Sequence, residues 1–233
     1  MAAPTFQAVG ATASSAGGAN MTVVAPAHQT DDILVLCVQN FSNANLTFNQ
    51  NTAGYALLDW AGGTNRSCNV YWVRATSGSM TNPSVTCATN HQIGCIFVVR
   101  GCITSGNPWD VSANSDFATT TSWSWPSVTT TVADTLCVMV GGSIRDNTGQ
   151  WLSSEANSNL TGVTEDFDDS ITINAGGGLA VWHGTSGSAQ SIGSGTATAA
   201  ASYAGDTVTV SFIPPASGGS VLGGRASLLG VGR

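Results

Sequence analysis

The sequence contains no lysine and has few charges of any kind. Its six cationic side chains are all arginines, only two of its thirteen acidic residues are glutamates, and 8% of its 233 residues are charged, where about 25% is usual. The formal net charge is -7. A chain with so few cations cannot neutralise a run of phosphates. The composition therefore argues against a nucleic-acid binder and against binding to an anionic membrane surface.

Long apolar runs are also missing, because the longest ones have only the length of a strand. This argues against a transmembrane span. No basic residue precedes Arg66, and the N-terminal region has no apolar stretch of signal-peptide length, so we expect no secretion signal in this sequence. Disorder is not expected either, because 42% of the residues are hydrophobic and cluster in short runs.

Residues that favour helices are scarce, whereas Thr, Val, Ser, Gly and Asn are abundant, which predicts an all-β protein. Short apolar runs bounded by turn residues are typical of a jelly-roll-like antiparallel β-sandwich. No linker divides them, so we expect one domain over residues 1–215. The expected strands are residues 5–10, 20–24, 33–39, 69–74, 83–88, 92–100, 117–123, 127–132, 135–141, 160–166, 177–184 and 207–213, with a turn at 13–18 and a loop at 40–51.

Two kinds of strand are expected. Residues 207–212 alternate, which predicts that Val208, Val210 and Phe212 face the core while the intervening Thr207, Thr209 and Ser211 face water. Residues 33–38, 95–99 and 136–140 are continuously apolar, so something must cover both of their faces. That cover is either a loop of the same chain or a neighbouring subunit.

The six cysteines predict core thiols more than a disulfide framework. Cys37, Cys95 and Cys137 lie inside the apolar runs, where a free thiol behaves as a small hydrophobe. The others, Cys68, Cys87 and Cys102, lie near expected strand ends or loops, where one pairing is conceivable. Neither a CxxC motif nor a Cys/His pair with zinc spacing is present.

Residues 216–233 form a Gly/Ser-rich C-terminal arm that contains no acidic residue and two of the six arginines. One interpretation is a flexible terminus. The other is an extended arm that docks on a partner through apolar anchors, with its arginines meeting acidic groups. The predicted partner-binding residues are Val221, Leu222, Arg225, Leu228, Leu229 and Arg233.

The sequence predicts no catalytic, cofactor-binding or metal site. The histidines, His28, His91 and His183, accompany no nucleophile motif, and we expect His91 and His183 to be satisfied strand histidines. The acidic run at residues 165–169 lacks the glycine and terminal glutamate of a calcium loop, so a solvated turn is favoured over a calcium site or a carboxylate pair.

Three tryptophans offer a further candidate contact. Trp109, Trp123 and Trp125 lie in turn-like stretches, where an aromatic face can stack on a sugar or on a protein partner. Packing over the end of the sandwich is the alternative.

One set of segments carries a resemblance to known proteins: residues 3–10, 26–34, 70–74, 100–110, 129–136 and 176–180, which include Val70-Tyr-Trp-Val-Arg74 and Gly106-Asn-Pro-Trp-Asp110. Together they resemble a family of β-sandwich virion proteins from tailed bacteriophages, over roughly residues 3–213. The resemblance implies a structural role without a catalytic centre.

Two functions remain open at this point. One is a capsid decoration or cement protein that stabilises the outside of the head. It would bind the major capsid protein and copies of itself as a homotrimer or other oligomer, in a virion assembled in the host cytoplasm. The other is a tail fibre or appendage module that binds a host surface glycan through Trp109, Trp123 or Trp125.

Overall fold

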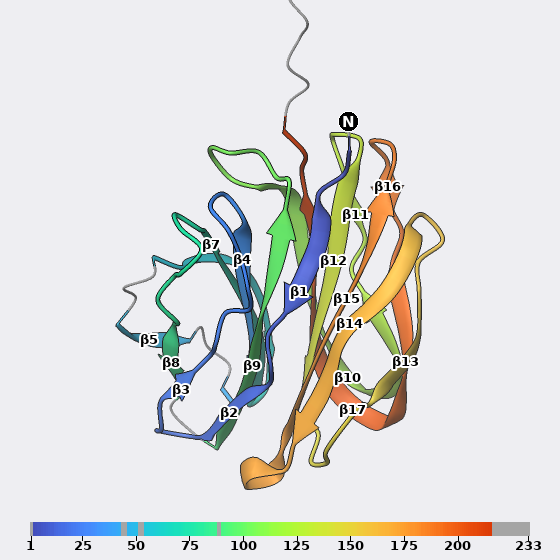
Figure 1. Cartoon of the computed structure of the whole chain (residues 1–233). Coiled ribbons are helices and arrows are strands. Elements are labelled where there is room, and N and C mark those ends of the chain that lie inside the picture. The colour runs from blue at the N-terminus through green and yellow to red at the C-terminus, as the bar shows by residue number, and fades with distance from the viewer. Residues whose placement is uncertain (1, 43–45, 51–53, 88–89, 216–233) are drawn as a thin grey trace, which may run out of the picture.

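The protein is an all-β sandwich of two antiparallel six-stranded sheets that lie face to face (Figure 1). The computed structural model describes residues 2–42, 46–50, 54–87 and 90–215. Besides the strands, these residues contain one short 3-10 turn, Ile173–Ala175. The expected all-β antiparallel sandwich is confirmed.

The first sheet comes from the N-terminal half of the chain. Its strand order is β1-β9-β4-β7-β6, and β2 also pairs with β9. A small sheet with the order β3-β8-β5 belongs to the same half. The strands are β1 (Thr5–Val9), β2 (Ala13–Ala16), β3 (Met21–Thr22), β4 (Ile33–Asn40), β5 (Thr47–Gln50), β6 (Ala56–Gly63), β7 (Arg66–Arg74), β8 (Ser84–Thr86) and β9 (His91–Arg100).

The second sheet comes from the C-terminal half. Its strand order is β10-β17-β12-β15-β14, β13 pairs with β17, and a separate two-stranded pair is formed by β11 and β16. The strands are β10 (Trp109–Trp125), β11 (Val128–Thr129), β12 (Thr135–Ser143), β13 (Leu152–Ala156), β14 (Thr161–Ile171), β15 (Gly177–Ser186), β16 (Ser191–Ile192) and β17 (Gly195–Phe212).

The two halves have the same topology. In each sheet the five main strands, numbered in chain order, stand in the spatial order first, fifth, second, fourth, third, and in each half a minor pair (β3-β8 or β11-β16) repeats the same connectivity. The turn before the second main strand also repeats, because Asp31 and Asp134 both have positive φ, at 69° and 57°. The main strands of one sheet follow one another along the chain, so this order does not support the finer expectation of a jelly roll.

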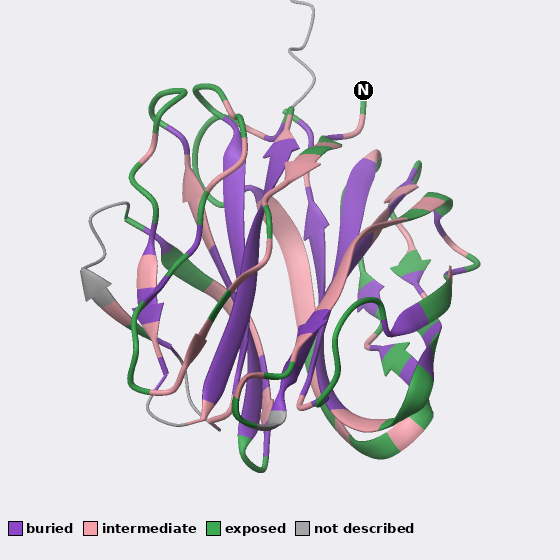
Figure 2. Cartoon of the chain, turned by 60° about the horizontal axis from the view of Figure 1, so that its bottom comes forward, coloured by how far each residue is buried: buried purple, intermediate pink, exposed green. Residues whose placement is uncertain are grey.

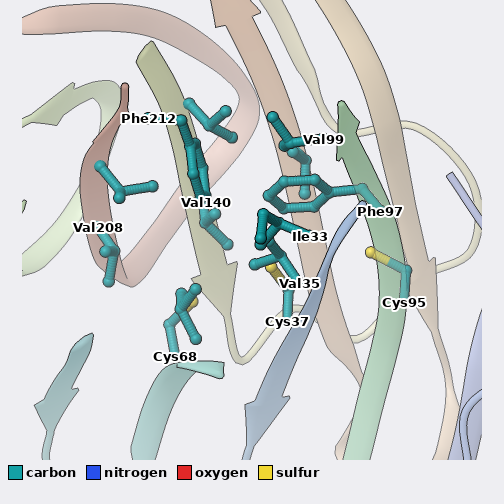
Figure 3. Close-up of a cluster of buried hydrophobic side chains, with 14 of the residues drawn as sticks. Ile33, Val35, Cys37, Cys68, Cys95, Phe97, Val99, Val140, Val208 and Phe212 are labelled. Atoms are coloured by element: carbon teal, nitrogen blue, oxygen red, sulfur yellow. The ribbon is translucent and has the colours of Figure 1, made fainter. Parts of the chain in front are cut away.

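The core lies between the sheets and draws equivalent positions from both halves. The inward side chains of β4 are Ile33, Val35 and Cys37, and those of β12 are Leu136, Val138 and Val140. Opposite them on the neighbouring strands lie Phe97 and Val210, each paired with the central valine of its half. Figure 3 shows side chains from the two sheets pointing toward one another in this cluster.

Both outer faces of the sandwich are also covered, and the cover comes from the same chain. Leu34 and Leu36 of β4 pack with Met21, Tyr55 and Val85, which lie in or next to the small β3-β8-β5 sheet. Cys137 and Met139 of β12 instead pack beneath tryptophans from β10, β15 and the start of β13. Figure 2 shows the resulting buried central strands. The apolar runs are therefore covered on both sides as expected, and of the two expected sources the same chain provides this cover.

The expectation for residues 207–212 is half wrong. Val208, Val210 and Phe212 face the core, but Thr207, Thr209 and Ser211 are fully buried on the opposite face. The Thr207 hydroxyl donates to the Ser124 carbonyl at 3.2 Å, and the Thr209 hydroxyl donates to the Pro126 carbonyl at 2.8 Å. A polar residue on an alternating strand can thus face a third layer instead of water, provided that backbone carbonyls there accept its proton.

All twelve expected strands overlap observed ones, but the sequence did not indicate several others. Residues 13–16 form β2 where a turn was expected, and β5 lies inside the expected loop at 40–51. The strands β6, β13 and β16 were missed, as were the first half of β10 and the first two thirds of β17. These segments are rich in Ala, Ser, Thr, Gly and Asn, so their side chains do not produce a two-residue apolar alternation.

Candidate functional site

The predicted partner-binding residues Val221, Leu222, Arg225, Leu228, Leu229 and Arg233 lie outside the described residues. The structure does describe the point from which the arm leaves, because the last described residue is Pro215, three residues after the end of β17. The N-terminus and this point lie at the same end of the sandwich (Figure 1). The connection between the sheets, residues 101–108, crosses at that end too. We call this region the crossover end.

The base of the arm is held by backbone hydrogen bonds. The Ile213 N–H donates to the Pro108 carbonyl at 3.0 Å, and the Ile103 N–H donates to the Ile213 carbonyl at 3.2 Å. Arg74, the last residue of β7, donates through Nη1 to the Ile103 carbonyl at 2.6 Å and through Nη2 to the Gly106 carbonyl at 3.2 Å. The crossover and the arm base are therefore tied to each other and to the first sheet.

A hollow of about 350 Å³, open to solvent, lies beside the arm base. It is lined by Ile103, Thr104, Ser105 and Pro215. These described lining residues bear no charge and no titratable group.

Trp109 begins β10 at the crossover end and is half-buried. Its ring meets Trp72 edge to face, with ring centroids 5.2 Å apart. The next residue, Asp110, accepts hydrogen bonds from the backbone N–H and the hydroxyl of Thr131. Of the three candidate tryptophans, Trp109 is the one that still reaches solvent.

The other two candidate tryptophans are core residues, so of the two alternatives the structure shows packing at these positions and not a stacking surface. Trp123 and Trp125 are 1% and 0% exposed. Trp123 packs edge to face against Trp151 at 4.6 Å, and Trp125 packs against Trp182 at 5.3 Å. The Trp125 indole N–H donates to the Val140 carbonyl at 2.9 Å. Their ring faces are occupied by other aromatics, which leaves no room for a sugar.

The three histidines make structural contacts. His183 Nδ1 lies 2.6 Å from Asp166, and its ring stacks on Phe6 of the other sheet with centroids 5.0 Å apart. His91 is fully buried at the start of β9, and burial lowers its pKa. His28 lies in the turn before β4, where Nδ1 contacts the Pro26 carbonyl at 2.7 Å and Nε2 accepts from the Met80 N–H at 3.2 Å.

The acidic run at residues 165–169 is not the expected solvated turn. It lies within strand β14, and its carboxylates tie neighbouring segments together. Asp168 accepts the backbone N–H groups of Trp151 and Leu152 at 2.7 and 2.8 Å, and Asp169 accepts the Thr12 hydroxyl. Burial raises the pKa of Asp168 to about 7. These carboxylates anchor β13 and the N-terminal segment.

Across the residues that the structure describes, the potential metal ligands are not clustered and the cysteine side chains are buried. Among the described residues, no His, Cys, Asp and Glu side chains gather in a set that could hold a metal ion. All six cysteines are buried thiols. Burial raises their pKa values wherever a shift is resolved, to about 11 for Cys137 and about 12 for Cys102. In the same described part of the chain, no helix is long and apolar enough to span a bilayer.

The arginines of the described residues are all engaged within the fold. Arg66 is buried beside Asp206, with Nε 3.3 Å from the carboxylate, and Arg145 lies under the Tyr203 ring with its guanidinium 5.7 Å from the ring centroid. Arg100 forms a two-bond fork with Asp32 at 2.7 and 2.8 Å, and Arg74 holds the crossover. All thirteen acidic residues belong to the described part of the chain, whereas Arg225 and Arg233 belong to the arm.

Comparison with known proteins gives no relative: no family model, no curated protein and no solved structure matches this chain.

Proposed function

We propose that this protein is a non-enzymatic structural component of a tailed-bacteriophage virion, a decoration or cement protein that binds the outside of the head. Its partners in this proposal are the major capsid protein and further copies of the chain, as a homotrimer or other oligomer. The C-terminal arm, residues 216–233, attaches each copy to a neighbour. The resemblance of residues 3–213 to phage virion proteins supports the identity of the particle, and the arm supports the mode of attachment.

The observation that carries the proposal is the division of charge between body and arm. The body has all thirteen acidic residues, and its four arginines are engaged in internal contacts. The arm has two arginines and no acidic residue, and its base is fixed by the backbone bonds of Ile213. A cationic, glycine-rich segment that leaves an acidic body at a fixed point is suited to reach an acidic surface on a neighbouring subunit.

The contacts of the buried polar groups support a structural role as well. On β14, Asp168 accepts backbone protons and Asp169 accepts a hydroxyl proton, and the histidines contact carboxylates, carbonyls or aromatic rings. A surface of hydroxyls and amides with sparse acidic charge remains soluble and adheres poorly to anionic cell envelopes. Both properties suit the outside of a particle.

Deletion of residues 216–233 tests this proposal. Since the arm base ends in a closed hydrogen-bond network at Ile213, we expect the truncated protein to keep the fold and the thermal transition of the full chain. We expect its occupancy on purified capsids, measured by co-sedimentation, to fall at least about tenfold, which corresponds to roughly 1.4 kcal/mol. A matched control exchanges Arg225 and Arg233 for glutamine and keeps the length of the arm. Full occupancy of the truncated protein would contradict the proposed attachment.

The alternative, a glycan-binding tail appendage, now depends on Trp109 alone, since Trp123 and Trp125 are buried. Trp109→Ala separates the two functions. Under the decoration proposal, capsid occupancy of this variant is unchanged. A glycan array on which the full chain binds, and on which Trp109→Ala abolishes binding, would favour the appendage.

A further inference from the structure

The two halves of the chain relate to each other as the two subunits of a dimer do. Each half forms a complete sheet with the same strand order, and the main chain passes from one sheet to the other once, between β9 and β10. The inner face of each sheet is apolar and buried against the inner face of the other. Neither face could remain exposed in water, so each half requires the other as its partner.

Polar contacts at the margins of this interface also join one half to the other. At the β6/β10 margin the Asn114 amide donates to Asp59 at 2.8 Å, and Arg66 pairs with Asp206 at 3.3 Å. At the opposite margin Thr12 donates to Asp169, and Phe6 stacks on His183. An apolar centre with a polar rim is the usual anatomy of an interface between subunits.

The single crossover has the features of a hinge. Gly101 and Gly106 have φ of 81° and 72°, a conformation that glycine adopts without strain and from which it can rotate freely. Residues 104–107 are exposed. The closed position is held by the two hydrogen bonds from Arg74 and by the backbone bond between Ile103 and Ile213. Opening the hinge breaks only a few bonds besides the interface itself.

We propose that two copies of this chain can exchange halves through the crossover, so that the N-terminal sheet of one copy packs on the C-terminal sheet of the other. Every contact between the halves then forms again in the exchanged dimer, because the partner supplies the same residues. The single chain and the exchanged dimer then differ only in the crossover, which is folded back in the single chain and extended in the dimer. The exchange does not depend on the arm or on the proposed attachment to capsids.

Chain length provides a direct way to force the exchange. The crossover runs from β9 to β10. Because β10 lies opposite β6, and β6 is three strands away from β9 in the first sheet, the crossover must span both that width and the gap between the sheets. With strand and sheet spacings of about 4.8 and 10 Å, this path covers roughly 17 Å. Deleting residues 103–107 leaves Gly101, Cys102 and Pro108, whose four Cα steps reach at most about 14 Å. The shortened connection therefore falls short of this span, which disfavours closure within one chain and favours closure between two chains.

The test measures the mass of this deletion variant by light scattering after size exclusion. We expect a folded dimer with twice the mass of the chain and the far-UV spectrum of the parent. The matched control replaces residues 103–107 with five Gly and Ser residues, which removes the same side chains but keeps the length, and is expected to have the oligomeric state of the parent. A folded deletion variant with the mass of a single chain would overturn the proposal.

A second variant keeps the proposal testable if the deletion prevents folding. Ser105→Arg places a trypsin site in the exposed crossover, and cleavage there leaves two halves without a covalent link. Isotope-labelled and unlabelled nicked proteins are unfolded, mixed and refolded, and native mass spectrometry then counts complexes with one labelled half. We expect hybrids at the statistical proportion. Halves that separate after cleavage, or that fail to reassemble into folded hybrids, would overturn the proposal.

Discussion

The buried pair of Arg66 and Asp206 offers a sharp test of how the two sheets are joined. Arg66 belongs to the first sheet and Asp206 to the second, and the Asp206 side chain is 0% exposed. Burial raises the pKa of Asp206 to about 7, against the opposing effect of Arg66. The contribution of Asp206 to the free energy of unfolding is therefore complete below its unfolded pKa near 3.8, and it is lost as the pH rises through the folded pKa of about 7.

The perturbation is Arg66→Met, which removes the cation and leaves Asp206 buried without it. At pH 8 the parent carboxylate is mostly ionised beside Arg66, and because loss of the cation raises the pKa of Asp206 further, the variant holds a proton there that the parent does not. At pH 5.5 Asp206 is protonated in both proteins, and an unsatisfied neutral group costs about 1–3 kcal/mol. The free energy lost relative to the parent should therefore be larger at pH 8 than at pH 5.5 by up to about 1.4 kcal/mol, because pH 8 lies one pH unit above the parent pKa of about 7.

Urea unfolding followed by tryptophan fluorescence measures both values, with the parent at the same pH as reference so that other titrating groups cancel. The control makes Arg66→Met in the background of Asp206→Asn, and its loss relative to Asp206→Asn alone should be the same at both pH values. The reasoning would be refuted by a loss below about 1 kcal/mol at pH 8, the level of an exposed ion pair. A loss in Arg66→Met that does not vary with pH would refute it equally.

Two further predictions concern reagents that report accessibility. A disulfide reagent such as DTNB at pH 8 should leave the native protein unmodified and titrate six thiols in denaturant, because burial holds the cysteines out of reach; rapid reaction of a native thiol would contradict their placement. Trypsin should cut the native chain after Arg225 and remove residues 226–233. This cleavage should be at least about a thousandfold faster than cleavage at the arginines of the body, because cleavage there requires the body to unfold. Intact mass spectrometry reads the product, and early cleavage at Arg74 or Arg100 would be inconsistent with their contacts.

The sequence predicted the fold class because its apolar runs are short and bounded by turns. The run at residues 33–38 shows both the success and its limit. Continuous hydrophobicity indicated a strand that is covered on both faces, and β4 is such a strand. The source of the cover was not predictable, since β5, in the small sheet that covers β4, contains too few apolar side chains to show a period.

The internal repeat was not predicted from the sequence, because equivalent positions in the two halves are apolar in both but are mostly occupied by different residues. Ile33, Val35 and Cys37 correspond to Leu136, Val138 and Val140, with one identical residue among them. A short clue existed: Thr-Ser-Gly-Ser occurs at residues 76–79 and 185–188, at or just after the end of the fourth main strand in each half. Buried strands tolerate exchange among apolar residues of similar volume, so two halves can keep the same topology when their sequences differ.

The candidate site was harder to predict than the fold. Trp123 and Trp125 stand in a polar stretch that resembles an exposed turn, yet they lie at the end of β10, beside the start of β17, and meet Trp151 and Trp182 edge to face. Local composition could not reveal a contact between segments so distant in the chain. The same holds for the acidic run, whose partners Thr12 and Trp151 lie on other elements.

Electron microscopy of labelled virions tests the central claim most directly. A gold-binding tag is placed at the N-terminus, which lies at the crossover end beside the base of the arm (Figure 1). If the chain is a decoration protein held by its arm, gold should be distributed over the outer surface of the head and should disappear from particles assembled with the protein truncated after Pro215. Gold confined to the tail, or particles that bear no gold at all, would contradict the account.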